Sequence, residues 1–114
     1  MEDLFQVSLE QLGGVPVLRA VGEIDVSTAP ALRDQLIALP ESNSRVIVDL
    51  SEVTFLDSTG LGVLISAHKR LRDSPSHGEV ALVVTRPQIT KVLEVTGLTL
   101  VFPLFSSLNE ALAQ

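Results

Sequence analysis

The chain has 114 residues, 46% of them hydrophobic, which suits one globular domain with a buried core, so we expect a single domain over residues 1–114. It contains no cysteine and two histidines, which excludes disulfides and thiolate chemistry and argues against a metal site or a cofactor. The formal net charge of −6 argues against binding to nucleic acid or anionic membranes and favours a partner with a basic patch.

The start of the chain does not resemble a secretory signal, because residues 1–5 have no cationic lead and no long apolar run follows them. We therefore expect the protein to stay in the cytoplasm. The most apolar window, residues 98–105, is much shorter than the roughly 20 residues of a spanning helix and is broken by Pro103. No membrane insertion is expected.

Two strand-like runs, residues 4–9 and 15–22, begin the chain. Residues 11–14 lie between them and end in Gly13 and Gly14, which supply the positive φ angles of a tight turn. The pattern predicts an N-terminal antiparallel hairpin.

A first helix is expected to open near Ser27 or Thr28, both of them candidate caps, with Pro30 in its first turn. Residues 40–44 end this helix. Its apolar face consists of Leu32, Leu36 and Leu39.

Residues 45–50 form a nearly continuous β-branched run, which is typical of a central strand covered on both faces. A short crossing leads to Asp57 and to a helix that begins around Ser58 and ends in a basic run at residues 69–72. The apolar face of this helix is predicted to carry Leu61, Leu64, Ile65 and His68, and His68 is expected to be a packed or partly exposed residue rather than a ligand.

Residues 73–78 are expected to form a surface loop, and residues 80–84 a second buried strand. A helix follows, with Pro87 early in it and Gly97 as its stop. Its inward face is expected to carry Ile89, Val92 and Leu93.

The C-terminal part is predicted to contain a short last strand at residues 98–102. Ser107 and Glu110 then have the spacing of a capping box, which predicts a terminal helix. This helix would carry Leu108, Ala111 and Leu112 on one face.

The fold class that follows is α/β. Alternating strands and helices predict β-α-β units, and hence a mixed sheet of about five strands with the N-terminal hairpin at one edge. About four helices should pack mainly on one face of this sheet.

Ser58 places a hydroxyl where a helix begins, and its surroundings leave two roles open. As a cap, the hydroxyl accepts the first free backbone N–H groups of the helix. As a phosphorylation site, it carries a phosphate that the same N–H groups and the helix dipole stabilise.

The residues around Ser58 also leave alternatives open. Gly60 and Gly62 each cost up to ~1 kcal/mol relative to Ala in a helix, which either tight packing on the sheet or close approach of a partner explains. Asp57 either bonds the loop, orients the Ser58 hydroxyl or contacts a basic group of a partner. Glu23 and Asp25 precede a helix, where carboxylates suit the dipole, and they are also candidate partner contacts.

Two segments carry a family resemblance. Gly22-Glu23-Ile24-Asp25, together with Phe55-Leu56-Asp57-Ser58-Thr59-Gly60-Leu61-Gly62, resembles the anti-sigma factor antagonists of the STAS domain class. The order of the expected elements agrees with that family over residues 4–112. The resemblance implies a single STAS domain with a partner-binding surface made of Glu23, Asp25, Thr28, Asp57, Ser58, Thr59, Gly60, Leu61 and Gly62.

The resemblance further implies partner switching. In the family, the Ser directly after Asp is phosphorylated by a partner that is both anti-sigma factor and Ser kinase, and that position here is Ser58. Thr59 replaces a second Ser found in some members, which leaves its own modification open. The unphosphorylated domain binds the kinase, which frees a sigma factor for transcription in a stress response, and a Ser/Thr phosphatase reverses the modification.

Two alternatives come from other classes. One is a non-switching STAS subunit of a lipid or anion transport assembly. The other is a small hydrolase or phosphotransfer enzyme using Asp57 and Ser58, but no His lies at a recognisable spacing and no nucleophile elbow or phosphate loop is present. We therefore expect a kinase substrate that is not itself an enzyme, and its oligomeric state stays open.

Overall fold

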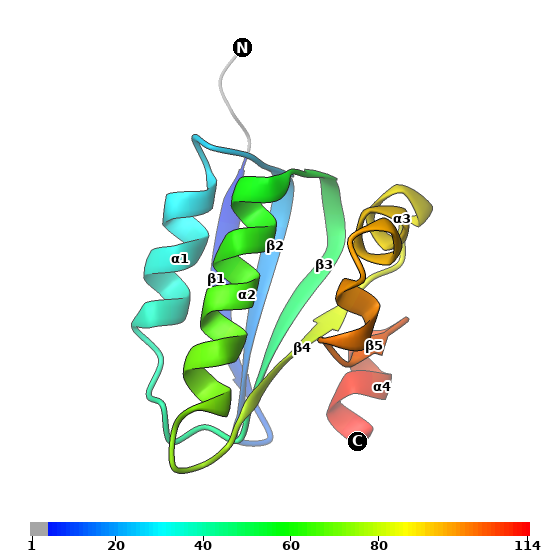
Figure 1. Cartoon of the computed structure of the whole chain (residues 1–114). Coiled ribbons are helices and arrows are strands. Elements are labelled where there is room, and N and C mark those ends of the chain that lie inside the picture. Colours follow the sequence, from blue (N-terminus) through cyan, green and yellow to red (C-terminus); the bar gives the residue numbers. More distant parts are fainter. Residues whose placement is uncertain (1–4) are drawn as a thin grey trace.

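A five-stranded sheet and four α-helices make up residues 5–114, the part of the chain that the computed structural model describes (Figure 1). The strands are β1 (Gln6–Leu12), β2 (Val15–Ile24), β3 (Arg45–Leu56), β4 (Glu79–Val83) and β5 (Leu104–Phe105). The helices are α1 (Ala29–Ile37), α2 (Ser58–Arg72), α3 (Pro87–Val95) and α4 (Leu108–Ala113), with a 3-10 turn, η1, at Leu98–Leu100.

The strands are arranged in sequence order, β1-β2-β3-β4-β5. β1 and β2 are antiparallel, and all later neighbours are parallel, so the sheet is mixed as predicted. Gly13 and Gly14 form the hairpin turn with φ angles of 59° and 81°. β1 continues to Leu12, three residues beyond the predicted strand, whose first residue, Leu4, lies outside the described part of the chain.

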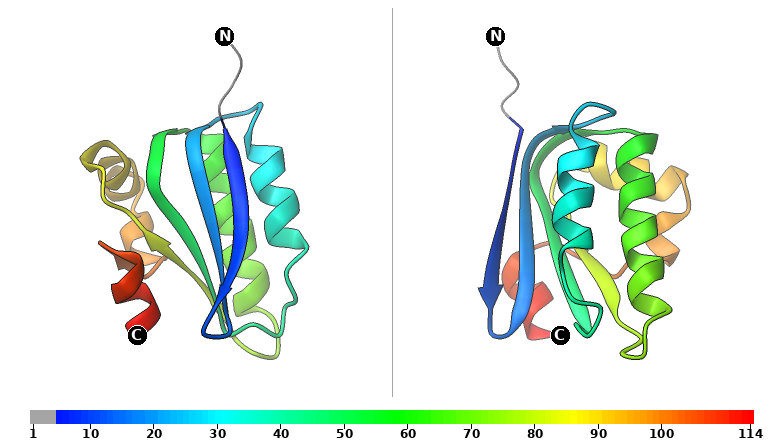
Figure 2. Two further views of the ribbon diagram at one scale, coloured as in Figure 1. Left: turned by 180° about the vertical axis from the view of Figure 1, so that it is seen from behind. Right: turned by 90° about the vertical axis from the view of Figure 1, so that its left-hand side faces the viewer.

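Three of the four helices pack on one face of the sheet. α1, α2 and α3 cover this face, and α4 lies against the other (Figure 2). The larger core lies under the three helices and includes Leu18, Ile24, Leu32, Leu50, Leu64, Leu82, Ile89 and Leu93. Each of these fully buried side chains stabilises the fold by roughly 1.5–3 kcal/mol. The smaller core, under α4, consists of Val17, Ile47, Ala81, Val83 and Ala111.

β3 is twice as long as the predicted strand at residues 45–50 and runs without a crossing to Leu56. Two register shifts in the β2–β3 pairing each place an extra residue in β3. The buried residues Leu50, Val53 and Leu56 therefore recur every three residues instead of alternating, which hides the strand in the sequence. Gly22, with a φ of 107°, lies at the second shift.

The predicted last strand at residues 98–102 is wrong. Gly97 ends α3 in the left-handed region, at a φ of 76°, and the chain turns into η1. Leu98 and Phe102 are buried four residues apart, as on a helical turn, and Leu100 between them is 91% exposed. The actual edge strand, β5, follows Pro103 and pairs with β4.

The terminal helix α4 begins as predicted. The Ser107 hydroxyl accepts a hydrogen bond from the backbone N–H of Glu110 at 3.1 Å. The Glu110 carboxylate accepts from Ser106, one residue before the expected cap, which lowers the pKa of Glu110. The hydrogen bond between the Glu110 carboxylate and the backbone thus involves Ser106, one residue before the position that a standard capping box uses.

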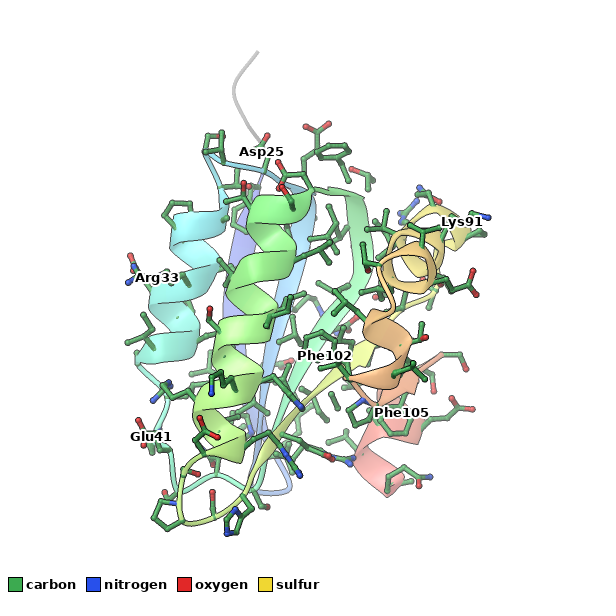
Figure 3. All side chains as sticks on the ribbon, in the orientation of Figure 1. Asp25, Arg33, Glu41, Lys91, Phe102 and Phe105 are labelled. Atoms are coloured by element: carbon green, nitrogen blue, oxygen red, sulfur yellow. The ribbon has the colours of Figure 1, made fainter. Side chains whose placement is uncertain are left out.

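The C-terminal end of α1 is held by a side chain of α2. The last turn of α1 has no basic residue, and the Arg70 guanidinium supplies the missing cation. It donates to the carbonyls of Leu36 at 2.9 Å and Leu39 at 3.3 Å, and to the Glu41 carboxylate at 2.9 Å. Figure 3 shows Glu41 at this end of the molecule.

His68 joins α2 to the sheet and is packed, as predicted. Its Nδ1 accepts a hydrogen bond from the Val80 backbone N–H at 3.0 Å, and its ring meets Phe102 edge-on with centroids 5.1 Å apart. Burial lowers the pKa of His68 below its ordinary value of 6.5. The Arg72 cation adds to this lowering, while Glu79 opposes it.

The lowered pKa of His68 predicts a loss of stability in acid. Unfolding restores the ordinary pKa, so the unfolded chain binds more protons than the folded one as the pH falls below about 6.5. The stability from neutral His68 is fully present above that pH and is lost as the pH falls through the folded-state pKa. We expect the melting temperature of the wild type to decrease when the pH is lowered from about 7.5 to about 5.5. In His68→Gln, which retains a hydrogen-bond acceptor, this decrease should be smaller.

His77→Gln is the matched control, because His77 lies in an exposed loop. This variant should keep the wild-type dependence on pH. If the melting temperature of His68→Gln falls with pH as steeply as that of the wild type, the acid-induced loss of stability does not come from His68.

Candidate functional site around Ser58

The two sequence segments that resemble the STAS family meet at the carboxyl ends of β2 and β3. Glu23 pairs with Phe55, and Ile24 with Leu56. The Asp57 backbone N–H donates to the Ile24 carbonyl at 3.2 Å, which joins the two strand ends. Figure 3 shows Asp25 at the end of the molecule where α2 begins. Parallel pairing thus brings together residues more than thirty positions apart.

Asp57, and not Ser58, caps α2. The Asp57 Oδ1 accepts hydrogen bonds from the backbone N–H groups of Thr59 at 2.9 Å and Gly60 at 3.1 Å. The proposed capping role of Ser58 is therefore wrong, because an adjacent carboxylate already occupies those donors. The N–H groups of Thr59 and Gly60 are therefore already occupied and do not stabilise a phosphate on Ser58 as the sequence suggests, whereas the helix dipole still favours it.

Ser58 is the first residue of α2, and its side chain is exposed. Within residues 5–114 its hydroxyl makes no hydrogen bond. Thr59 is also exposed, and its side chain lines a groove between α1 and α2. The Ser58 hydroxyl is thus free to react without breaking an internal contact.

The loop from β2 to α1 is held by a network around Thr28. The Thr28 hydroxyl donates to the Glu23 carbonyl at 2.7 Å and accepts from the Asp25 backbone N–H at 2.9 Å. The Asp25 carboxylate accepts from the Ser27 hydroxyl at 2.8 Å and from the Ser27 backbone at 3.0 Å. These hydrogen bonds, with that of the Ser27 hydroxyl the largest, lower the pKa of Asp25.

The expectation that Ser27 or Thr28 caps α1 is corrected by this network. Thr28 stands at the N-cap position, but its side chain bonds to the loop and caps no helix N–H. Its side chain is only 5% exposed. The buried Thr28 side chain therefore fixes the conformation of the β2–α1 loop, while Asp25 stays accessible.

The surface around Ser58 is acidic and partly apolar. Glu23, Asp25 and Asp57 have no ion-pair partner within residues 5–114. Val26, 72% exposed, and Phe55, 48% exposed, flank these carboxylates in the sequence. Val26 and Phe55 were not assigned to the site from the sequence, although Val26, an apolar residue in a polar loop, was an available signal.

The two glycines of α2 have different roles. A Cβ on Gly60 would lie 2.6 Å from Ile24 Cγ2 and 2.6 Å from Leu56 Cδ1, so Gly60 permits tight packing on the sheet. A Cβ on Gly62 would meet no atom within 4 Å among residues 5–114, apart from the backbone of its own helix. Packing therefore explains Gly60 but not Gly62. Leu61, between them, is 7% exposed and belongs to the core.

A groove of about 510 Å³ runs between α1 and α2. Thr59 and Gly62 line it near the start of α2, and Arg70 lines it in the last turn. Its walls include the apolar residues Leu36, Ile37, Val63 and Ala67.

The sequence model of the STAS domain family matches residues 6–111. This chain belongs to the STAS domain family of anti-sigma factor antagonists. Its relatives include the anti-sigma-F factor antagonist RsfB of Mycobacterium tuberculosis, 36% identical over 112 residues, with 96% of this chain and 88% of the relative covered. The anti-sigma-B factor antagonist of Listeria monocytogenes is 39% identical over 79 residues, which are 68% of each chain.

The crystal structure of an anti-sigma factor antagonist from Mycobacterium paratuberculosis has the same STAS fold. The TM-score is 0.88 and the identity 34%, and the superposition covers 99% of this chain and 95% of the other. The α/β architecture with an N-terminal hairpin is thus that of a STAS domain.

The described part of this STAS domain contains neither a candidate metal-binding group nor a candidate membrane-spanning helix. Across residues 5–114, no group of three or more His, Asp or Glu side chains is placed to hold a metal ion. None of the helices in the same part of the chain has the length and apolar character needed to cross a bilayer.

The two glycines of this STAS domain predict opposite effects of alanine. Gly60→Ala should lower the free energy of unfolding by about 1–3 kcal/mol, because Ile24 Cγ2 is fixed in the core and cannot move away. Gly62→Ala should raise it by up to ~1 kcal/mol, because the helix gains propensity at no steric cost. Urea unfolding of both variants measures the difference, and effects of the same sign would contradict the assignment.

Proposed function

We propose that this chain is an anti-sigma factor antagonist. Its unphosphorylated form binds an anti-sigma factor with Ser kinase activity and thereby frees a sigma factor. The observation that carries the proposal is the Ser58 side chain, which is exposed and unbonded at the start of α2 and stands next to Asp57. The relatives named as antagonists of anti-sigma factors support the same class of partner.

The binding surface in this proposal contains Glu23, Asp25 and Asp57 together with the exposed part of the first turn of α2. Their unpaired carboxylates attract a basic patch, and the net charge of −6 steers the approach of such a partner. Val26 and Phe55 add apolar area that a partner can bury. Thr28 and Leu61, both buried, support this surface from beneath.

Phosphorylation of Ser58 ends binding in this proposal. A phosphoserine adds about −1.5 to −2 charges at neutral pH. Because Asp57 already occupies the N–H groups of Thr59 and Gly60, the phosphate meets a neighbouring carboxylate and no free backbone donor from those residues. A 100-fold loss of partner affinity needs about 2.7 kcal/mol, which one poorly paired, desolvated phosphate in an interface supplies. A Ser/Thr phosphatase restores the binding form.

We assign the phosphate to Ser58 in preference to Thr59, whose side chain lies in the groove between the helices. The chain is the substrate of the kinase and not an enzyme, and within residues 5–114 no His is bonded to the Ser58 hydroxyl. This role places the protein in the cytoplasm with its sigma factor.

The proposal predicts opposite behaviour of two Ser58 variants. Ser58→Ala should bind the anti-sigma factor like the unphosphorylated wild type and should resist the kinase, whereas Ser58→Asp should bind at least about tenfold more weakly. Calorimetry measures the affinities. Ser42→Asp, which adds the same charge at an exposed loop position, is the matched control and should bind like wild type.

The site of modification is tested by incubating the chain with ATP and each candidate kinase of the same cell, followed by mass spectrometry. We expect one phosphate, on Ser58. If Ser58→Ala and Ser58→Asp bind with equal affinity, the proposed switch is contradicted. A chain that no kinase modifies would contradict it as well.

Phosphorylation should leave the fold intact. Within the described residues 5–114 the Ser58 hydroxyl has no hydrogen bond to lose, and the helix dipole partly offsets repulsion from Asp57. We expect the melting temperature of the phosphorylated chain to change by less than about 4 °C, which is under 1 kcal/mol for a domain of this size. A larger drop in a thermal scan would mean that the switch acts by partial unfolding.

A further inference from the structure

The groove between α1 and α2 is lined in part by the apolar residues Leu36, Ile37, Val63 and Ala67. The two helices lie side by side on the same face of the sheet (Figure 1), and the space between them measures about 510 Å³. Val63 and Ala67 are half-buried in it, and Ile37 is 50% exposed at its edge. An apolar groove between two helices suits an apolar segment of another chain.

Gly62 deepens this groove at a cost to the fold. Glycine at this interior position of α2 destabilises the helix by up to ~1 kcal/mol relative to alanine. Within residues 5–114, an added Cβ on Gly62 would meet no atom within 4 Å outside its own helix backbone, in contrast to Gly60. Gly62 lines the groove and leaves open space where a side chain would stand.

The two cations that line the groove differ in availability. The Arg70 guanidinium is bonded to the end of α1 and to Glu41. The Arg33 side chain is 62% exposed, and its one ion pair within residues 5–114 is a long contact of 3.9 Å to its neighbour Asp34. Arg33 is therefore the cation that can receive a carboxylate from outside.

The groove is continuous with the surface around Ser58, because Thr59, the next residue, lines it. We propose that the groove receives a segment of the anti-sigma factor that places an apolar side chain over Gly62 and a carboxylate on Arg33. This inference rests on the function proposed above and adds a second contact region of opposite charge. The acidic surface around Ser58 binds a basic part of the partner, and the groove binds an apolar, acidic segment.

A partner must then present both charges at the correct spacing. Charge complementarity of this kind improves specificity and fixes the register of an interface more than it adds affinity. The arrangement distinguishes the cognate anti-sigma factor from proteins that are merely basic.

The test uses the full chain and the anti-sigma factor that the wild type binds. Gly62→Leu fills the groove with a good helix former, and Arg33→Glu reverses the charge at its edge. We expect each variant to lose at least about tenfold in affinity by calorimetry, while the melting temperature of Arg33→Glu stays near that of the wild type and that of Gly62→Leu is equal to it or higher.

Matched controls lie on α3. Gln88→Leu and Lys91→Glu make the same kinds of change at exposed positions. Figure 3 shows Lys91 on α3 and Arg33 on α1, on opposite sides of the molecule. Both controls should bind within about twofold of the wild type.

The outcomes separate the two proposals. If the wild type binds, Ser58→Asp weakens binding, and both groove variants bind like wild type, then the groove proposal is overturned and the switch stands. If the wild type binds no anti-sigma factor, both proposals fail. If the wild type forms a dimer and Gly62→Leu does not, the groove proposal is overturned in favour of a second copy of the chain. If decanoate binds the wild-type chain saturably and Gly62→Leu abolishes this binding, the groove proposal is overturned in favour of a small anionic amphiphile.

Discussion

The close approach of α2 to the ends of β2 and β3 determines where every part of the site lies. Gly60 has no side chain, so the first turn of the helix rests directly on Ile24 and Leu56. The Asp57 N–H bonds the Ile24 carbonyl from the same turn. A helix that began farther from the sheet would separate Ser58 from the β2–α1 loop. The exposed hydroxyl and the carboxylates around it share one surface because this contact is tight.

The sequence predicts the hairpin, the starts of the helices and the buried strands, since these depend on local signals such as paired glycines, proline in a first turn and β-branched runs. It does not reveal the second half of β3, because extra residues in the β2–β3 pairing change the spacing of its buried side chains from two to three. Asp57 and Ser58 are both good capping residues at adjacent positions, and only the backbone geometry decides between them. The groove arises from the separation of two helices, which no local pattern encodes.

Charge and rigidity act together in the proposed interface. The Thr28 hydroxyl, buried under the loop, fixes the path of the chain from Glu23 to Asp25, so the acidic groups are held in place before a partner arrives. An interface that forms on ordered residues loses little conformational entropy. The same order makes the surface sensitive to one added charge, because the loop has few ways to move aside. In the proposed switch, binding of the partner and its loss on phosphorylation therefore have a common structural origin.

The bridge from Arg70 to the end of α1 has a mechanical consequence. Three carbonyls at the foot of α1 and the Glu41 carboxylate share one guanidinium that belongs to α2. The two helices cannot spread or slide at that end without breaking several charge-assisted hydrogen bonds at once. Arg70 thus acts as a fixed spacer that sets the distance between α1 and α2 at this end of the groove.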